Sequence, residues 1–200
     1  MVEEFNVVLA GVGGQGILLA SQILGIAALK EGLNVVVSEI HGMAQRGGAV
    51  VSHVRMGSKV YAPTVMDGKA DAILGLEPLE ALRNIKYAST ETLVLVSTET
   101  LVPAGVSAEP INYPRLETIL DAIKGFTEKI VLVDALKLAR EAGSVITRNV
   151  VMLGALAATK ILPLKSEALK ETIKELVRPA YLNQNLKAFD LGLNEISKLF

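Results

Sequence analysis

The sequence predicts an open, mostly parallel α/β sheet of Rossmann-like type, with helices on both faces and a helical C-terminal tail. A buried apolar stretch at residues 5–10 leads through a glycine-rich turn into an apolar helix expected at 17–30. A β-branched stretch at 34–38 follows, which completes a strand, helix and strand. Beyond residue 134 the apolar residues recur at helical spacing. The length suits a single domain, residues 1–200.

Further strands and helices are expected along the rest of the chain, and the pattern turns helical after Asp134. Strands are predicted at 50–56, 70–76, 92–97 and 130–134, and helices at 78–86, 114–124, 135–142, 149–160, 166–177 and 182–199. Gly32 is placed to stop the first helix, Pro114 suits a first helical position, and Asp134 suits a helix cap. The opening strand, helix and strand predict a parallel sheet with a right-handed crossover.

The composition argues against binding of nucleic acid or an anionic membrane and against a metal centre in this chain. Lys and Arg total 20 against 21 Asp and Glu, so the net charge of −1 gives no broad field for nucleic acid or an anionic membrane. With no cysteine and two histidines, the chain is not expected to hold a thiolate metal site or an iron–sulfur cluster. Any electron carrier is therefore expected in another chain.

Residues 5–29 carry no charge, which is long enough to consider a membrane span. Five glycines interrupt this stretch, and Glu3 and Glu4 precede it where a signal peptide would carry positive charge. The chain is therefore expected to be cytoplasmic. Its hydrophobic content of 50% suits a sheet covered on both faces together with a buried subunit interface.

The first candidate binding element is a G-x-G-x-x-G loop between the first strand and the first helix. Its candidate residues are Gly11, Gly13, Gly14, Gln15 and Gly16. Backbone N–H groups and the helix N-terminus can approach a phosphate there, although the glycines also suit a tight turn alone. Glu39 follows at the distance expected of an acid that binds a ribose, which makes NAD binding a hypothesis.

The second candidate element is the polar loop 38–48. Its candidate ligand-binding residues are Glu39, Gln45, Arg46, Gly47 and Gly48. Arg46 can grip a phosphate or carboxylate bidentately with Glu39 holding its guanidinium, or the two can form an internal pair that only shapes the loop. His41 is expected to be a hydrogen-bonded loop residue, and no catalytic residue is assigned.

The sequence lacks three motifs that are typical of independent enzymes. It contains no G-x-S-x-G elbow, no Walker loop and no H-E-x-x-H zinc motif. Catalysis by this chain alone is therefore not expected.

Several segments resemble a known family. The glycine loop, His41-Gly42-Met43-Ala44-Gln45-Arg46-Gly47-Gly48 and Ser52-His53-Val54-Arg55 look like the gamma-type domain of 2-oxoacid:ferredoxin oxidoreductases. Segments 77–82, 149–155 and 185–189 extend the similarity over essentially the whole chain. The His-Gly-Met-Ala-Gln form resembles the beta subunits of the indolepyruvate-type branch rather than the pyruvate branch.

This resemblance implies a small subunit that completes a larger assembly. An alpha subunit would hold thiamine diphosphate and [4Fe-4S] clusters, decarboxylate an aryl 2-oxo acid, pass electrons to ferredoxin and release an acyl-CoA. This chain would line the cleft through which coenzyme A enters, and would hold no cofactor alone. Two alternatives stay open: a stand-alone NAD(P)-dependent dehydrogenase, and a regulatory module that binds CoA or an adenine ligand.

Overall fold

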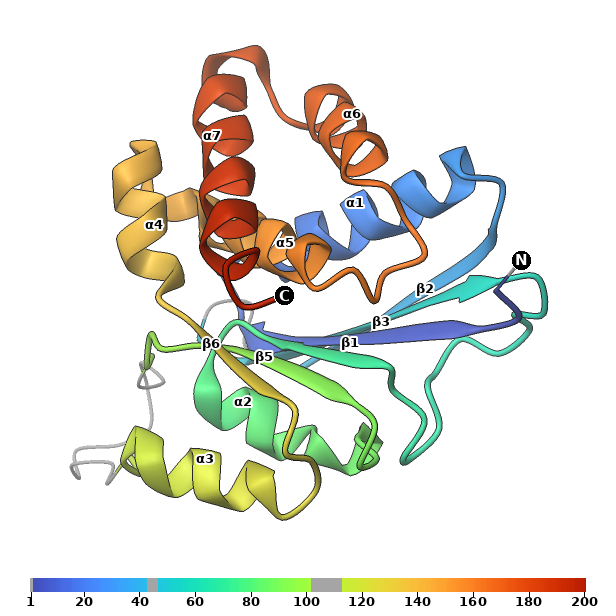
Figure 1. Ribbon diagram of the computed structural model, residues 1–200, viewed down its shortest axis with the longest axis vertical. Coiled ribbons are helices and arrows are strands. Elements are labelled where there is room, and N and C mark those ends of the chain that lie inside the picture. Colours follow the sequence, from blue (N-terminus) through green and yellow to red (C-terminus); the bar gives the residue numbers. More distant parts are fainter. Residues whose placement is uncertain (1, 43–46, 102–112) are drawn as a thin grey trace.

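The computed structural model describes residues 2–42, 47–101 and 113–200. A six-stranded sheet has the order β2-β3-β1-β4-β5-β6 (Figure 1). Its strands are β1 (Phe5–Val12), β2 (Asn34–His41), β3 (Ala49–Gly57), β4 (Ala72–Gly75), β5 (Leu93–Ser97) and β6 (Ile130–Val133). The α-helices are α1 (Ile17–Lys30), α2 (Pro78–Arg83), α3 (Leu116–Lys124), α4 (Ala135–Ala142), α5 (Arg148–Ala158), α6 (Ser166–Leu176) and α7 (Pro179–Ile196), and short 3-10 turns lie at Ile85–Tyr87 and Val145–Thr147.

Helices cover both faces of the sheet, as predicted. In Figure 1, α1 and α4 to α7 lie on one face, and α2 and α3 lie on the other. Each face has its own apolar core: Leu9 of β1 belongs to the larger cluster with Leu24 and Phe189, whereas Val8 belongs to the smaller cluster with Ile119. Successive residues of β1 thus point to opposite cores, which explains the apolar run at residues 7–10.

The sheet is mixed rather than parallel throughout. β1, β4, β5 and β6 pair in parallel, but β3 is antiparallel to both β1 and β2. The predicted mostly parallel sheet is therefore confirmed, with β3 as the antiparallel strand among the described residues; β1 and β2 run in the same direction, as predicted, but β3 lies between them. The connection from β2 to β3, residues 42–48, is too short for a crossover, so it joins antiparallel neighbours and places β3 between β1 and β2.

Several predicted helix ends are confirmed and others shift. Gly32 follows the C-cap residue Glu31 of α1 with φ of +78°, and the Asp134 carboxylate accepts from the Lys137 N–H at 3.0 Å as the cap of α4. The expected start of α3 at Pro114 was wrong, because this helix begins at Leu116 after an extended Arg115. The tail helix α7 begins at Pro179, earlier than predicted, since proline favours a first helical turn.

Two helices of the tail approach each other through glycines. A Cβ atom on Gly154 of α5 would lie 2.0 Å from the Phe189 carbonyl oxygen, and a Cβ on Gly192 of α7 would lie 2.0 Å from the Val151 carbonyl oxygen. The missing side chains therefore allow the two backbones to touch, which anchors the tail helix against α5.

A loop between β3 and β4 covers the sheet where α2 and α3 do not reach. The Arg55 guanidinium donates to the carbonyl of Ala62 at 2.7 Å and to the Asn6 side chain at 3.0 Å, and it pairs with Glu4. His53 Nδ1 accepts from the Val65 N–H at 3.2 Å. His53 and Arg55 thus fasten this loop to the sheet.

The stability of the protein should depend on the protonation of His53. Burial lowers the pKa of His53, and the nearby Lys86 and Arg55 charges lower it further. The unfolded chain, with an ordinary histidine pKa of about 6.5, therefore binds the proton first. The free energy of unfolding should fall as the pH falls below about 6.5. Urea unfolding of the parent and of His53→Asn between pH 8 and 5 checks this, and parallel pH curves would contradict it.

Within the described ranges, no helix combines the length and apolar character needed to cross a membrane.

Candidate functional site

The glycine loop forms the turn between β1 and α1. Gly14 and Gly16 have φ of +103° and +80°, a region that other residues avoid. α1 has no side-chain cap and no acid in its first turn. Its leading N–H groups, which have no acceptor within the helix, thus keep the partial positive charge that favours an anion.

The second candidate element contacts the first. The Gly13 N–H donates to the Gly48 carbonyl at 2.8 Å, and the Gly47 N–H donates to the Gly13 carbonyl at 3.3 Å. Gly47 has φ of +76°. The structure therefore brings the two motifs together through residues that are 34 and 35 positions apart in the sequence.

A pocket of about 650 Å³ opens where these two elements meet. It is lined by Val12, Gly13, Gly14, Gly16, Ile17, Leu18, His41, Gly42 and Val50. Aliphatic side chains and the bare glycine backbone form its walls. His41 is the titratable group among the described lining residues. The size and the mainly apolar walls suit a small organic ligand or part of a nucleotide-like one.

Gln15 does not line this pocket, because its side chain is buried beneath the loop. Its Oε1 accepts from the Val12 N–H at 2.8 Å, and its Nε2 donates to the Leu76 carbonyl at 2.8 Å. Gln15 therefore bridges the carboxyl ends of β1 and β4, where ligands often bind in open α/β sheets. A Cβ on Gly11 would lie 2.6 Å from this Oε1, so Gly11 makes room for the bridge.

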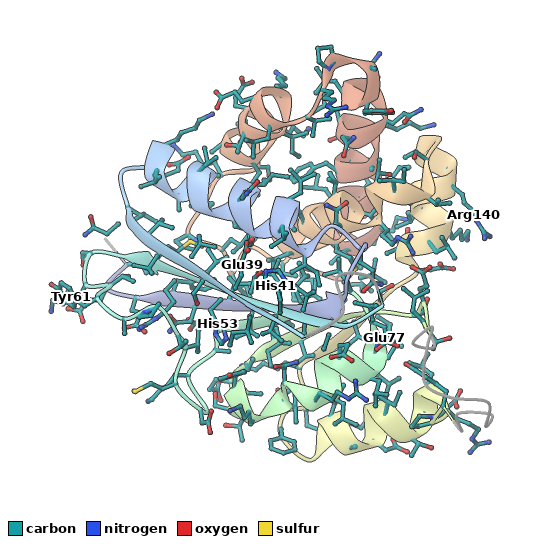
Figure 2. The ribbon with its side chains drawn as sticks, turned by 180° about the vertical axis from the view of Figure 1, so that it is seen from behind. Glu39, His41, His53, Tyr61, Glu77 and Arg140 are labelled. Atoms are coloured by element: carbon teal, nitrogen blue, oxygen red, sulfur yellow. The ribbon has the colours of Figure 1, made fainter. Side chains whose placement is uncertain are left out.

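Glu39 and His41 lie on the face of β2 that α1 covers (Figure 2). The Glu39 carboxylate is 3.4 Å from His41 Nε2, and its other oxygen is 3.5 Å from the Ser21 hydroxyl of α1. Ser52 is paired with Glu39 across β2 and β3, and its buried hydroxyl has no hydrogen-bond partner within the described residues. Glu39 and His41 thus form a polar cluster beside the pocket.

This arrangement counts against the NAD hypothesis. In dinucleotide-binding sheets the strand that carries the ribose-binding acid lies next to the first strand. Here β3 separates β2 from β1, so Glu39 lies one strand further away than that role requires.

Gln45 and Arg46 lie outside the described residues. The predicted pairing of Arg46 with Glu39, and the contact of either residue with a ligand, therefore stay predictions.

Asn149 is a loop-positioning residue that sequence reasoning did not single out. It lies in the first turn of α5, and its Nδ2 donates to the Gly16 carbonyl at 3.0 Å. A Cβ on Gly16 would lie 2.6 Å from that nitrogen. Arg148, beside it, pairs with Glu99 after β5. The resemblance of segment 149–155 to the family was the available signal for Asn149.

Glu77 is a second residue that was missed. Its buried carboxylate caps α2 by accepting from the Glu80 N–H at 2.9 Å, and it accepts from Leu101 N–H at 3.4 Å and from the Tyr113 hydroxyl. Burial and this carboxylate raise the pKa of Tyr113 well above its usual range. Tyr113 therefore stays protonated and donates its hydroxyl hydrogen to Glu77. This hydrogen bond connects the segment that precedes α3 to the segment that follows β4.

In the parts of the chain that are described, no three His, Asp or Glu side chains gather as a metal site.

Comparison with known proteins identifies the family. A model of the pyruvate ferredoxin/flavodoxin oxidoreductase family matches residues 6–195. The chain is 47% identical to indolepyruvate oxidoreductase subunit IorB of Pyrococcus horikoshii, over 99% of this chain and 98% of that protein. It is 29% identical to the pyruvate/ketoisovalerate oxidoreductases common subunit gamma of Thermococcus kodakarensis, over 92% and 93% of the two chains. The crystal structure of pyruvate oxidoreductase subunit PORC from Thermotoga maritima is similar with a TM-score of 0.72 at 26% identity, over 96% of each chain. The chain therefore belongs to the pyruvate ferredoxin/flavodoxin oxidoreductase family, as a small subunit of gamma type.

Proposed function

We propose that this chain is the small subunit of a CoA-acylating 2-oxoacid:ferredoxin oxidoreductase that acts on indolepyruvate or a related aryl pyruvate. A larger alpha subunit holds thiamine diphosphate and [4Fe-4S] clusters, and ferredoxin takes the electrons. The observation that carries the proposal is the 47% identity with an indolepyruvate oxidoreductase subunit over nearly the whole of both chains. The lower identity of 29% to a pyruvate/ketoisovalerate subunit favours the aryl branch.

The pocket at the glycine loop is the part of this chain that we assign to coenzyme A. Its glycines expose backbone N–H groups at the start of α1, which suits a phosphate, and its apolar walls suit the uncharged arm of the same molecule. Glu39 orients His41 at the rim. Arg46, which precedes Gly47 and Gly48 in the sequence, is the residue that we assign to bind a phosphate of coenzyme A, because a guanidinium is always charged.

The isolated chain should be inactive. Purified alone, it should contain no bound iron or thiamine and should not reduce an artificial electron acceptor with indolepyruvate and CoA, because its sequence has neither cysteine ligands for a cluster nor a Gly-Asp-Gly thiamine motif. Activity should appear when a cysteine-rich thiamine enzyme co-purifies with it. Turnover by the partner-free chain would refute this division of labour, and CoA binding without partner-dependent turnover would favour a regulatory module.

Replacing Gly14 with valine should weaken CoA use by the assembled enzyme. Gly14 lines the pocket, and its φ of +103° strains any other residue. A branched side chain there would crowd a phosphate, so the apparent CoA constant should rise about tenfold, equivalent to about 1.4 kcal/mol. Steady-state titration with CoA measures this constant.

Gly32→Val is the matched control for this experiment. Gly32 lies at the other end of α1 with φ of +78°, and at both glycines an added Cβ would meet no atom within 4 Å. The two variants therefore carry similar backbone strain, but Gly32 is remote from the pocket. If the two variants had equal apparent CoA constants, the glycine loop would have only a structural role.

A further inference from the structure

The two edges of the sheet differ in how they are protected from pairing with another strand. β6 has four residues and is flanked by the charged residues Lys129 and Asp134. β2 has eight residues, including Val35-Val36-Val37, and contains no lysine, arginine or proline. Soluble proteins usually shorten an edge strand, charge it or break it with proline. β2 has none of these devices, apart from the carboxylate of Glu39.

The side chains of β2 also leave apolar surface in contact with solvent. Val37 is 38% exposed and Ile40 is 51% exposed, and they lie on opposite faces of the strand. Apart from the pairing with β3, the backbone groups of β2 make no hydrogen bond to other described residues. α1 covers one face of β2, and on the other face the Ser38 hydroxyl donates to the Pro63 carbonyl at 2.7 Å. The outward row of peptide groups along the edge is thus available to a further strand.

We propose that β2 pairs antiparallel with β2 of a second copy of this chain, about a twofold axis at Ser38. Such an interface is isologous, which means that both copies contribute the same strand. The outward N–H and C=O groups of β2 in one copy then pair with those of β2 in the other. The net charge of −1 on each copy offers little repulsion. The sheet then runs continuously through both copies. The inference rests on the edge strand alone and does not depend on the proposed function.

The pattern of side chains selects this register. Residues opposite each other across an antiparallel pair share a face, so the twofold axis passes through a residue. An axis at Glu39 would place the two carboxylates opposite each other. An axis at Val37 would place Asn34 opposite Ile40. The axis at Ser38 instead places Val36 of each copy opposite Ile40 of the other.

In this register like charges do not meet. Glu39 of one copy lies opposite Val37 of the other, and His41 lies opposite Val35. Glu39 keeps its contacts with His41 and Ser21 on its own chain. Residues 35–41 of both strands can therefore pair without an unfavourable charge contact.

A single cysteine at the axis tests the proposal directly, because the chain has no cysteine of its own. In Ser38→Cys of the full chain, mild oxidation should link two copies, since Cα atoms of directly opposed residues are close enough for a disulfide. Leu132→Cys on β6 is the matched control, because Leu132 is 43% exposed on the opposite edge strand. It should stay unlinked under the same conditions.

Ile40→Lys gives a second readout in the same protein. A lysine at this position should raise the dimer dissociation constant about tenfold or more in sedimentation, whereas Val37→Thr, which keeps the branched shape, should change it little. Thermal unfolding of each variant shows that the fold is intact. The proposal is overturned if folded Ser38→Cys stays unlinked, if it links only to a different protein, or if Leu132→Cys links as readily.

Discussion

Gly154→Ala should destabilise the protein by about 3 kcal/mol, the upper end of the usual cost of overpacking a core. The added methyl group would lie 2.0 Å from the Phe189 carbonyl oxygen and 3.0 Å from the Leu193 nitrogen. Both are backbone atoms of α7, so no side-chain rotation relieves the clash. α5 and α7 have to separate, which opens the core around the fully buried Phe189.

Thermal unfolding measures this effect, with an expected loss of about 6–12 °C for a chain of this size. Gly125→Ala is the control, because Gly125 follows α3 with a φ of −61° and an added Cβ would meet the Ala122 carbonyl at 3.2 Å. Its stability should stay within about 0.5 kcal/mol of the parent. If Gly154→Ala unfolds at the same temperature as Gly125→Ala, the two helices do not touch as described.

Local patterns in the sequence were sufficient to predict the elements but not all of their neighbours. Apolar periodicity located β1 and α1, because burial on one or both faces leaves a direct trace in the residue types. The pairing of β3 between β1 and β2 leaves no such trace. Strand order depends on the length and path of connections, which residue types encode weakly.

The candidate site shows the same limit at the level of single residues. The glycine motif predicted the turn, but its contact with Gly47 and Gly48 was found only in the structure. A motif does not say where a side chain points, so the inward bridge of Gln15 could not be foreseen. The bond from Asn149 to Gly16 joins residues 133 positions apart, which is beyond the reach of local reasoning.

Gln15→Glu should destabilise the protein strongly at neutral and alkaline pH. The introduced carboxylate would face the Leu76 carbonyl oxygen, which now accepts from Gln15 Nε2 at 2.8 Å, and would leave that oxygen without a donor. Gln15 is buried, so the charge would also lose its solvation. Together these effects should cost about 4 kcal/mol or more at pH 8, in line with the pKa shifts of other buried carboxyl groups.

The same variant should recover its stability in acid. A protonated carboxyl group has one O–H donor for the Leu76 carbonyl and a carbonyl oxygen for the Val12 N–H, so it reproduces both bonds of the amide. Burial raises the pKa of the introduced group in the folded state above its unfolded value of about 4.3. The folded state then binds more protons than the unfolded state between these two pKa values, and the free energy of unfolding falls as the pH rises through that window.

Urea unfolding of parent and variant from pH 4 to 8 tests this, because the difference between them at each pH cancels the titration of all other groups. Gln22→Glu provides the matched control: it makes the same substitution on an exposed position of α1, where the difference should stay near zero at every pH. If Gln15→Glu matched Gln22→Glu, the Gln15 side chain would have to be in contact with water. Gln15 would then be free to contact a ligand in the pocket, and the bridge between β1 and β4 would be held by other groups.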